Sequence, residues 1–366
     1  MLNKKYKIYS GIFSAITFLV FIASCTDKFD ISDIKISDNN NSGNFGDTLY
    51  IQQFPNWTGF NNPQDMIVGK DLFIYVADTD NNKIVMLDIS GQILGEKNIK
   101  KPIAIAQDYK LNLFVVAEFD TLINNQNLTF SALYKLNLVE TGHILSNTKL
   151  ERILPQDPNV DPFAFNRTDR FYSGVCTFYD NSVYISRKGP SNSNPVDRDN
   201  SIIRIRFLEN NSISIFKIPG LEPEGTGILS ANQISSLTSF NSKSTDVILT
   251  LVGNNSFKVQ WLEFISNSDF EGYLSKLSAF SCELMNVNKF GKPEDIALDE
   301  ANNIYVADAE KDSIFKFNTF GDEMESFGGI EMMSSPHAVA HYDRTLYVLD
   351  TDNNRILRFI LSTEID

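Results

Sequence analysis

The stretch Pro293-Glu-Asp-Ile-Ala-Leu-Asp299, with Asn303-Ile-Tyr-Val-Ala-Asp308 and Ser313-Ile-Phe-Lys-Phe317 after it, recurs along this 366-residue chain. Close copies run from Pro63 to Ile84 and from Pro336 to Ile356. Each copy holds three apolar runs of about five residues, separated by Asp, Asn and Gly clusters, and no run keeps a helical period. This pattern predicts three short β-strands in each copy.

A fourth strand completes the repeat unit. The runs Gln92–Ile99 and Asp322–Phe327 follow two of the copies. A unit of four antiparallel strands in about 40 residues is typical of a β-propeller blade. The prolines that begin the last two copies, Pro293 and Pro336, agree with this period because they are 43 residues apart.

The spacing of the copies predicts six blades. Pro102 begins a partial second copy 39 residues after Pro63, and a further 191 residues separate it from Pro293. Two weaker copies occupy that interval, at Phe171–Phe207 and Ile234–Leu262. The sequence therefore predicts an all-β fold, a six-bladed β-propeller of four-stranded antiparallel blades.

The last copy has three strands and too little chain after them for a fourth. Its third strand is Arg355–Leu361, and five residues follow. The run Asp47–Phe54 precedes blade one and has no partner of its own. We therefore expect this N-terminal strand to join blade six as its outer strand and to close the ring, which covers an otherwise open sheet edge.

The repeat residues resemble the NHL repeat family, whose units read Pro-x-Gly-(Ile/Val)-Ala-x-Asp, then Ile-Tyr-Val-(Ala/Ser)-Asp, then Asn-x-(Arg/Lys)-Ile. The match is good in blades one, five and six, partial in blade two and marginal in blades three and four. Asp65, Asp295 and Ala338 stand where the family has a glycine. We expect an ordinary extended backbone at these positions, or carboxylates that line the channel.

The N-terminus resembles a bacterial lipoprotein signal. Three lysines precede the apolar run Ile12–Ala23, which is short for a transmembrane helix, and the run ends in Phe21-Ile-Ala-Ser-Cys25. The resemblance implies cleavage before Cys25 and a lipid on its thiol. The alternative is a plain secretory signal with a chance cysteine.

Three segments follow from this interpretation of the N-terminus. They are residues 1–24, a signal peptide; residues 25–46, a flexible tether rich in Asp, Asn and Ser that starts at lipidated Cys25; and residues 47–366, the propeller. With 42% hydrophobic and 21% charged residues, the chain is typical of a well-cored globular protein.

The charge of the chain limits its partners. Removing residues 1–24 removes three lysines and no acid, so the formal net charge goes from −14 to −17. Such a body repels nucleic acid and anionic headgroups, so we expect no nucleic-acid partner and membrane attachment through the N-terminal lipid. The resemblance to a lipoprotein signal implies an outer-membrane lipoprotein that faces the periplasm or the cell surface, and we expect it to be a monomer.

Two cysteines remain besides Cys25. Cys176 falls in the predicted inner strand of blade three, and Cys282 lies near the outer strand of blade four. Because these positions are far apart in a propeller, we expect two small buried thiols rather than a disulfide.

Long insertions fall in the links that emerge on one face of a propeller, from second to third strand and from one blade to the next. They are Phe119–Ser131, Pro155–Arg170, Arg187–Asn200 and Pro219–Asn232. Long loops gathered on one face favour a binding function.

A basic and aromatic cluster belongs to these insertions. Its members are Arg167, Arg170, Tyr172, Arg187 and Lys188. Such groups can bind an anionic or sugar-like ligand. The alternative is a set of ion pairs that anchor the loops.

A second candidate site lies in the central channel. Gln64, Asp65, Glu294, Asp295 and His337 stand at the beginnings of inner strands, which converge on the channel. In this placement they resemble the cation ligands of gluconolactonase-type propeller hydrolases, which hold one divalent cation with carboxylates and amides. The resemblance implies Ca²⁺ or another divalent cation here, whereas the alternative is a polar, wet channel with no cofactor.

The loops Asp78–Asn82 and Asp350–Asn354 resemble calcium-ligand spacing, but they lack the glycine and the distal glutamate of an EF-hand loop. We expect structural turns, in which Asp and Asn bond their own backbone. We also find no Gly-x-Ser-x-Gly motif and no phosphate-binding glycine loop.

The sequence favours a non-catalytic, lipid-anchored binding or scaffold propeller of the cell envelope, which recognises a protein or small ligand on its loop-bearing face. The alternative function is a divalent-cation-dependent hydrolase or lyase with its site in the central channel.

Overall fold

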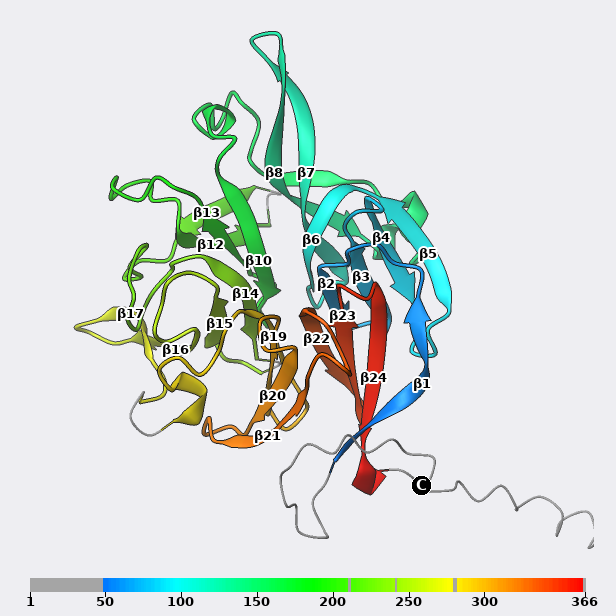
Figure 1. Ribbon diagram of the computed structural model, residues 1–366. Helices are drawn as coiled ribbons and strands as arrows, with labels where there is room; N and C mark the ends of the chain where they lie inside the picture. The colour runs from blue at the N-terminus through cyan, green and yellow to red at the C-terminus, as the bar shows by residue number, and fades with distance from the viewer. Residues whose placement is uncertain (1–48, 210–211, 241, 279–281, 365–366) are drawn as a thin grey trace, which may run out of the picture. The chain divides into compact units, whose positions relative to one another are not determined.

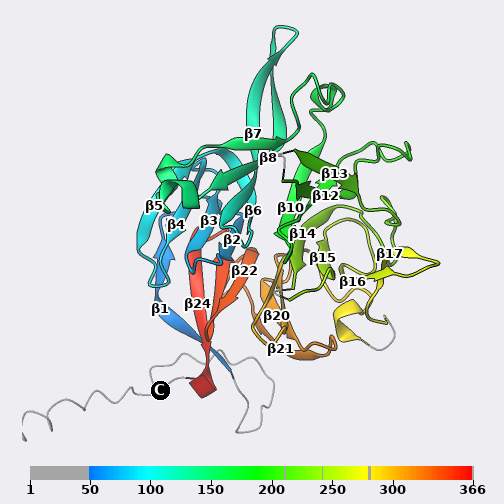
Figure 2. The ribbon, with the colours of Figure 1, turned by 180° about the vertical axis from the view of Figure 1, so that it is seen from behind.

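The computed structural model describes residues 49–209, 212–240, 242–278 and 282–364, and it holds six four-stranded antiparallel sheets (Figure 1). The sheets follow one another along the chain as blades, and their first strands surround a central channel (Figures 1 and 2). The six-bladed propeller predicted from the repeat is confirmed. The predicted signal peptide, Cys25 and the tether lie outside the described residues.

The strands of the first three blades are as follows. Blade one has β2 (Asp65–Val68), β3 (Ile74–Asp78), β4 (Lys83–Leu87) and β5 (Ile93–Asn98). Blade two has β6 (Lys100–Gln107), β7 (Asn112–Ile123), β8 (Gln126–Asn137) and β9 (Glu151–Leu154). Blade three has β10 (Phe171–Thr177), β11 (Val183–Lys188), β12 (Ser201–Phe207) and β13 (Ile213–Lys217).

The other three blades follow in the same order. Blade four has β14 (Ile234–Ser239), β15 (Val247–Leu251), β16 (Val259–Ser266) and β17 (Glu271–Ser275). Blade five has β18 (Pro293–Leu298), β19 (Ile304–Asp308), β20 (Ser313–Phe317) and β21 (Glu323–Gly328). Blade six has β22 (Pro336–Tyr342), β23 (Thr345–Asp350), β24 (Arg355–Leu361) and β1 (Tyr50–Thr58).

The helices in the described ranges are short 3-10 turns. They are η2 (Val139–Thr141), η3 (Leu145–Asn147), η4 (Ala164–Asn166), η5 (Glu283–Met285) and η6 (Ser362–Glu364). Within those ranges, no helix has the length and apolar character needed to cross a membrane.

The middle strands are buried on both faces because a neighbouring blade covers each side. Every residue of β3 and of β19 is buried, which explains why Ile-Tyr-Val-Ala-Asp reads as a continuous run rather than an alternating one. The outer strands β5 and β21, in contrast, have no buried residue. The core is therefore a series of apolar layers between blades.

The Asp-Thr-Asp-Asn-Asn loops are turns, as predicted. Asn81 donates from Nδ2 to Asp78 Oδ2 at 2.9 Å, and the left-handed backbone of Asn82, with φ of 53°, completes the turn. The threonines of both loops reach the next blade: Thr79 Oγ1 donates to the Pro102 carbonyl at 2.6 Å, and Thr351 Oγ1 donates to the Pro63 carbonyl at 2.8 Å. The loops therefore tie blade one to blade two and blade six to blade one.

The insertion at Phe119–Ser131, expected as a loop, is instead a β-hairpin. Strands β7 and β8 stay paired up to Ile123 and Gln126. Asn124 and Asn125 form the turn with φ of 49° and 64°, which is the pattern of a two-residue hairpin turn that matches strand twist. Figures 1 and 2 show the hairpin projecting beyond the rest of blade two.

Strand β1 lies antiparallel to β24, from Tyr50 opposite Leu361 to Thr58 opposite Arg355. Asp47 and Thr48 of the predicted closing segment lie outside the described residues. The contribution of this strand to ring closure stays a prediction.

Both described cysteines are free and buried. Cys176 lies in β10 and Cys282 lies between β17 and η5. The expectation of two buried thiols is confirmed.

Candidate functional site

The inner strands β2, β6, β10, β14, β18 and β22 line a central cavity of about 210 Å³. Four of the five predicted channel residues line it: Asp65, Glu294, Asp295 and His337. Gln64 lies beside it, where its Nε2 donates to Asn62 Oδ1 at 2.8 Å.

The two channel aspartates connect neighbouring inner strands. Asp65 Oδ2 accepts a hydrogen bond from the backbone N–H of Ile105 at 2.5 Å, which joins blade one to blade two. Asp295 Oδ2 accepts one from the backbone N–H of Val339 at 2.9 Å, which joins blade five to blade six. Asp295 Oδ1 also accepts a hydrogen bond from Ser236 Oγ of blade four at 2.6 Å.

Burial shifts the titration of both aspartates. It raises the pKa of Asp295 to about 6, against the hydrogen bonds that favour the ionised form. Burial, and then the negative charge of Asp295, raise the pKa of Asp65 well above its ordinary value. The negative charge of Glu294 also acts to raise the pKa of Asp295.

The channel residues do not fit a divalent-cation site. Calcium takes six to eight oxygen ligands. The described residues contain no group of three His, Cys, Asp or Glu side chains placed to hold a metal ion. The carboxylate oxygens of Asp65 and Asp295 already accept hydrogen bonds from neighbouring strands.

An ion pair of blade five lies at the end of the channel where β18 begins. Lys292 Nζ forms an ion pair with Glu294 Oε1 at 2.5 Å. Burial lowers the pKa of His337, so its imidazole is neutral at pH 7. Burial also lowers the pKa of Lys188, while the charge of Glu294 acts in the opposite direction.

Lys292 is not among the residues that the sequence pattern predicts for the channel. It lies immediately before the proline that begins β18, beside the position that varies between copies. The sequence did offer a signal for the ion pair. Lys292 stands two positions before Glu294, and residues i and i+2 of an extended strand share a face.

The four insertions lie on one face, which we call the insertion face, and they contact one another. Phe119 and Phe130, on the β7–β8 hairpin, pack near Phe165, in the link between blades two and three. Their ring centroids lie 6.3 Å and 5.5 Å from the centroid of the Phe165 ring. Asn200 Nδ2 of the blade-three loop donates to the carbonyl of Pro223, in the next link, at 2.7 Å.

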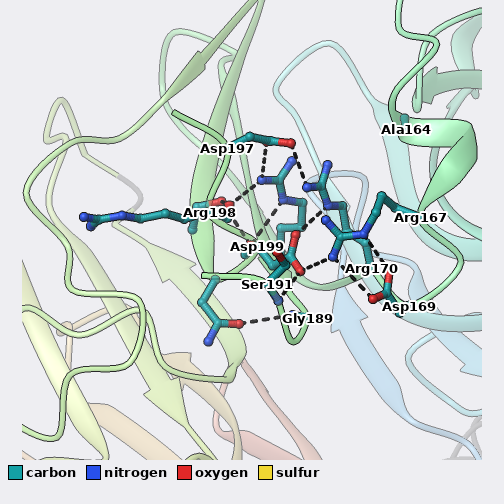
Figure 3. A network of polar contacts seen from close by, with 12 residues as sticks. Ala164, Arg167, Asp169, Arg170, Gly189, Ser191, Asp197, Arg198 and Asp199 are labelled. Carbon is teal, nitrogen blue, oxygen red and sulfur yellow. Dashed lines mark hydrogen bonds and ion pairs between the residues drawn. The ribbon is translucent and has the colours of Figure 1, made fainter. Parts of the chain in front are cut away.

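Asp199 is the centre of the contact between two of these insertions (Figure 3). Its side chain is fully buried. Arg167 Nη2 donates to Oδ2 at 2.5 Å, and Arg170 Nε donates to Oδ1 at 2.7 Å. The backbone N–H of Ser191 also donates to Oδ2, at 2.8 Å. The carboxylate therefore fixes the loop 189–200 against the link 155–170.

Asp197 extends this network. It accepts hydrogen bonds from Arg170 Nη2 at 2.8 Å, from Arg187 Nη2 at 3.0 Å and from Lys217 Nζ at 2.5 Å. Burial on its own would raise the pKa of Asp197, but the hydrogen bonds from Lys217 and Arg170 hold the pKa well below its ordinary value. Asp197 is therefore ionised and holds three basic side chains together.

The residues of the predicted basic and aromatic cluster thus lie in different environments. Arg167, Arg170 and Arg187 form ion pairs that anchor the loops, as the alternative interpretation predicts. Tyr172 packs in the core between blades two and three, and burial raises its pKa to about 12. Lys188 ends β11 and is half-buried.

Sequence reasoning did not assign the acids of this network. The alternation Asp197-Arg198-Asp199 in the insertion was the signal, because an acidic pair beside several arginines predicts ion pairing.

No protein-family model matches the chain, and no curated protein matches it. Solved structures resemble its fold at low identity. A Bacteroides thetaiotaomicron protein of unknown function is 10% identical, with a TM-score of 0.53 over 84% of this chain and 72% of that one. The PQQ-bound aldose sugar dehydrogenase of Streptomyces coelicolor is 12% identical, with a TM-score of 0.52 over 86% of this chain and 99% of that one.

A third similar structure is a protein to which gluconolactonase activity has been ascribed. It is 12% identical to this chain, with a TM-score of 0.51 over 84% of this chain and 94% of its own. At these identities the likeness concerns the propeller fold.

Proposed function

We propose that this chain is a non-catalytic binding or scaffold propeller of the bacterial cell envelope, attached to the outer membrane by a lipid on Cys25 and facing the periplasm or the cell surface. It acts as a monomer and recognises a protein partner on the insertion face. The observation that carries this proposal is the buried Asp199 network, which fixes two long insertions in one conformation.

A fixed platform is what a binding surface requires, because loops that are ordered in advance lose little conformational entropy on binding. Three of the four insertions contact one another. The link 155–170 contacts the blade-three loop through Asp199, and it contacts the β7–β8 hairpin through Phe165. These contacts lie over blades two and three, and the fourth insertion links blade three to blade four, so the four insertions occupy one part of the ring. Such asymmetry favours recognition by one sector of the face.

Exposed apolar side chains at the ends of these insertions also support the proposal. Leu122 on the hairpin is 68% exposed, Phe163 in the link 76%, and Val196 in the blade-three loop 81%. Large apolar side chains on otherwise polar loops mark protein-interaction surfaces when several of them share one face.

The test is a site-specific photo-cross-linker in place of Phe163, in the full chain in its native envelope. Phe320 is the matched control, because it is 73% exposed and lies in the β20–β21 turn, on the opposite face of the ring. We expect a discrete cross-linked protein from position 163 and none from position 320. Equal products from both positions, or none from position 163, would refute the proposed partner surface.

A second candidate function is that of a divalent-cation-dependent hydrolase or lyase with its site in the central channel. Its support is the raised pKa of Asp295, to about 6, because perturbed carboxylates gather at active sites. The similarity to a propeller with ascribed gluconolactonase activity supports the shared fold and not the activity. The donor set argues against it, since the described residues assemble no three metal-binding side chains.

Metal analysis distinguishes the two candidates. The binding proposal expects purified protein without stoichiometric Ca²⁺, Zn²⁺ or Mg²⁺, and no change of metal content in Glu294→Ala or His337→Ala. One bound ion per chain that is lost in Glu294→Ala would favour the channel enzyme instead.

A further inference from the structure

The outer half of the β7–β8 hairpin, residues 119–131, has open strand edges in the part of the chain that the structure describes. On the β8 side, pairing with β9 begins only at Leu133. On the β7 side, pairing with β6 ends at Glu118. Figures 1 and 2 show the end of the hairpin standing apart from the rest of blade two. Main-chain N–H and C=O groups along an open edge are a template for pairing with another chain.

The β8 edge is the more accessible of the two. On the β7 side, Lys100 Nζ donates to Asp120 Oδ1 at 2.5 Å and to Thr129 Oγ1 at 3.2 Å, so a lysine side chain lies over the start of that edge. On the β8 side, the four residues Gln126–Thr129 are exposed or half-buried. We call Gln126–Thr129 the hairpin edge.

The absence of charge distinguishes the hairpin edge from the outer strands of the blades. Natural sheets protect open edges with charged residues, with prolines or with short strands. Residues 121–129 include no charged residue and no proline. Each outer strand, in contrast, holds at least one of them: Pro55 in β1, Glu96 and Lys97 in β5, Glu151 and Arg152 in β9, Lys217 in β13, Glu271 in β17, and Glu323 and Glu325 in β21. The hairpin edge therefore lacks the protection that the outer strands have.

One face of the hairpin continues into the apolar surface of the neighbouring link. Leu128 shares this face with Phe130, because alternate residues of a strand point to the same side. The ring centroid of Phe130 lies 5.5 Å from that of Phe165. Phe163, two residues before Phe165, is 76% exposed. A strand added to the hairpin edge would place every second side chain on this apolar face.

We propose that the hairpin edge binds an extended segment of the partner protein, which adds to β8 as a third strand of the hairpin. The inference rests on the proposed function and specifies how the insertion face binds its partner. Main-chain hydrogen bonds hold the segment, and apolar side chains at its alternate positions pack on the Leu128 face. The segment is uncharged, because residues 121–129 offer no opposite charge to a charged side chain.

The test is a photo-cross-linker placed singly at each position of the hairpin edge, in the full chain in its native envelope, with the cross-linked peptides sequenced by mass spectrometry. Opposite residues of paired strands have Cβ atoms about 5 Å apart, so each position reports the residue opposite it. We expect the four positions to contact four successive residues of one partner segment, in ascending or descending order. Leu94 is the control, because it is 44% exposed on β5, whose edge is charged, and it should give no product.

Two lysine substitutions test the role of the uncharged edge. Asn127→Lys places a charge on the hairpin edge, and Ala301→Lys places the same charge on the exposed β18–β19 turn of the opposite face. With the photo-cross-linker at position 163, we expect Asn127→Lys to lower the cross-linking yield roughly tenfold at an unchanged melting temperature. Ala301→Lys should leave both the yield and the melting temperature unchanged.

The outcomes separate this inference from the proposed function. A discrete product from position 163, without the ordered contacts at the hairpin edge, overturns the added strand and leaves the proposed partner surface in place. A wild-type yield in Asn127→Lys also overturns the added strand. No product from position 163 or from the hairpin edge overturns both proposals.

Discussion

The Oδ2 atom of Asp295 accepts a hydrogen bond from the backbone N–H of Val339 at 2.9 Å, and this bond joins the inner strands of blades five and six. Asp65 does the same for blades one and two through Ile105. Both aspartates stand where the NHL pattern has glycine. A carboxylate at that position therefore replaces the permissive backbone of glycine with a side-chain link between blades.

The Asp295 link predicts a pH-dependent stability. The pKa of Asp295 is about 6 in the folded protein, above its ordinary value of 3.8, so between these values the folded state holds more protons than the unfolded state. The contribution of Asp295 is then fully present below about pH 4 and is lost as the pH rises through about 6.

Chemical denaturation of wild type and Asp295→Asn at several pH values measures this effect. The asparagine keeps an oxygen for the Val339 N–H and cannot ionise, so we expect the free energy of unfolding to fall less between pH 4 and 6 than in the wild type. Identical slopes in the two proteins would contradict the assignment.

Asp199→Ala should release the insertions without unfolding the ring. It leaves Arg167 and Arg170 without the carboxylate that both use, and breaking a buried ion pair in this way costs about 3 kcal/mol. We expect faster hydrogen exchange in residues 155–200, measured by mass spectrometry. Asp169→Ala is the control, because Asp169 pairs with the same Arg167 but is 51% exposed, and its loss should cost less than about 1 kcal/mol.

Tyr50 should stabilise the attachment of β1. Its ring is stacked on Phe327 with centroids 4.7 Å apart, and its hydroxyl lies 2.9 Å from that of Tyr305 in blade five. We expect Tyr50→Ala to lower the free energy of unfolding by about 2 kcal/mol, from lost packing and a lost hydrogen bond.

The control for β1 is Phe54→Ala, in the same strand, because that ring is 72% exposed. Its change in the denaturation midpoint should be small. Deleting residues 48–54 should be strongly destabilising, and a normal thermal transition for that deletion would argue against ring closure by the N-terminal strand.

Lipid attachment at Cys25 predicts a labelling pattern. Wild-type protein from cells fed an alkyne fatty acid should carry the label and sediment with membranes, because acyl chains supply membrane affinity. Cys25→Ser should carry no label and should be released, whereas Cys176→Ala should behave as the wild type does. Label that persists in Cys25→Ser would exclude this anchor.

Much of the fold could be predicted because the information is local. The run Ile-Tyr-Val-Ala-Asp has the length and composition of a buried strand, and its three close copies imply a repeated unit. The turn chemistry of Asp78 and Asn82 was also predictable, since Asp and Asn bond their own backbone within a few residues.

The candidate sites were predictable only in part, because the role of a charged side chain depends on its partners. Nothing near Arg170 in sequence distinguishes a ligand-binding arginine from one that anchors a loop. The partner, Asp199, lies 29 residues away and reaches it only when two insertions fold against each other. The hairpin at Asn124 and Asn125 was missed for a different reason, since its two-residue turn was counted as part of a longer loop.

The repeat alone was thus sufficient for the strands, the number of blades and the set of residues that begin the inner strands, because strand formation depends on neighbours along the chain. Tertiary structure decided how those residues act. It made Asp65 and Asp295 links between blades and paired three arginines with two acids. Charge compensation depends on distances between blades, and the sequence does not contain those distances.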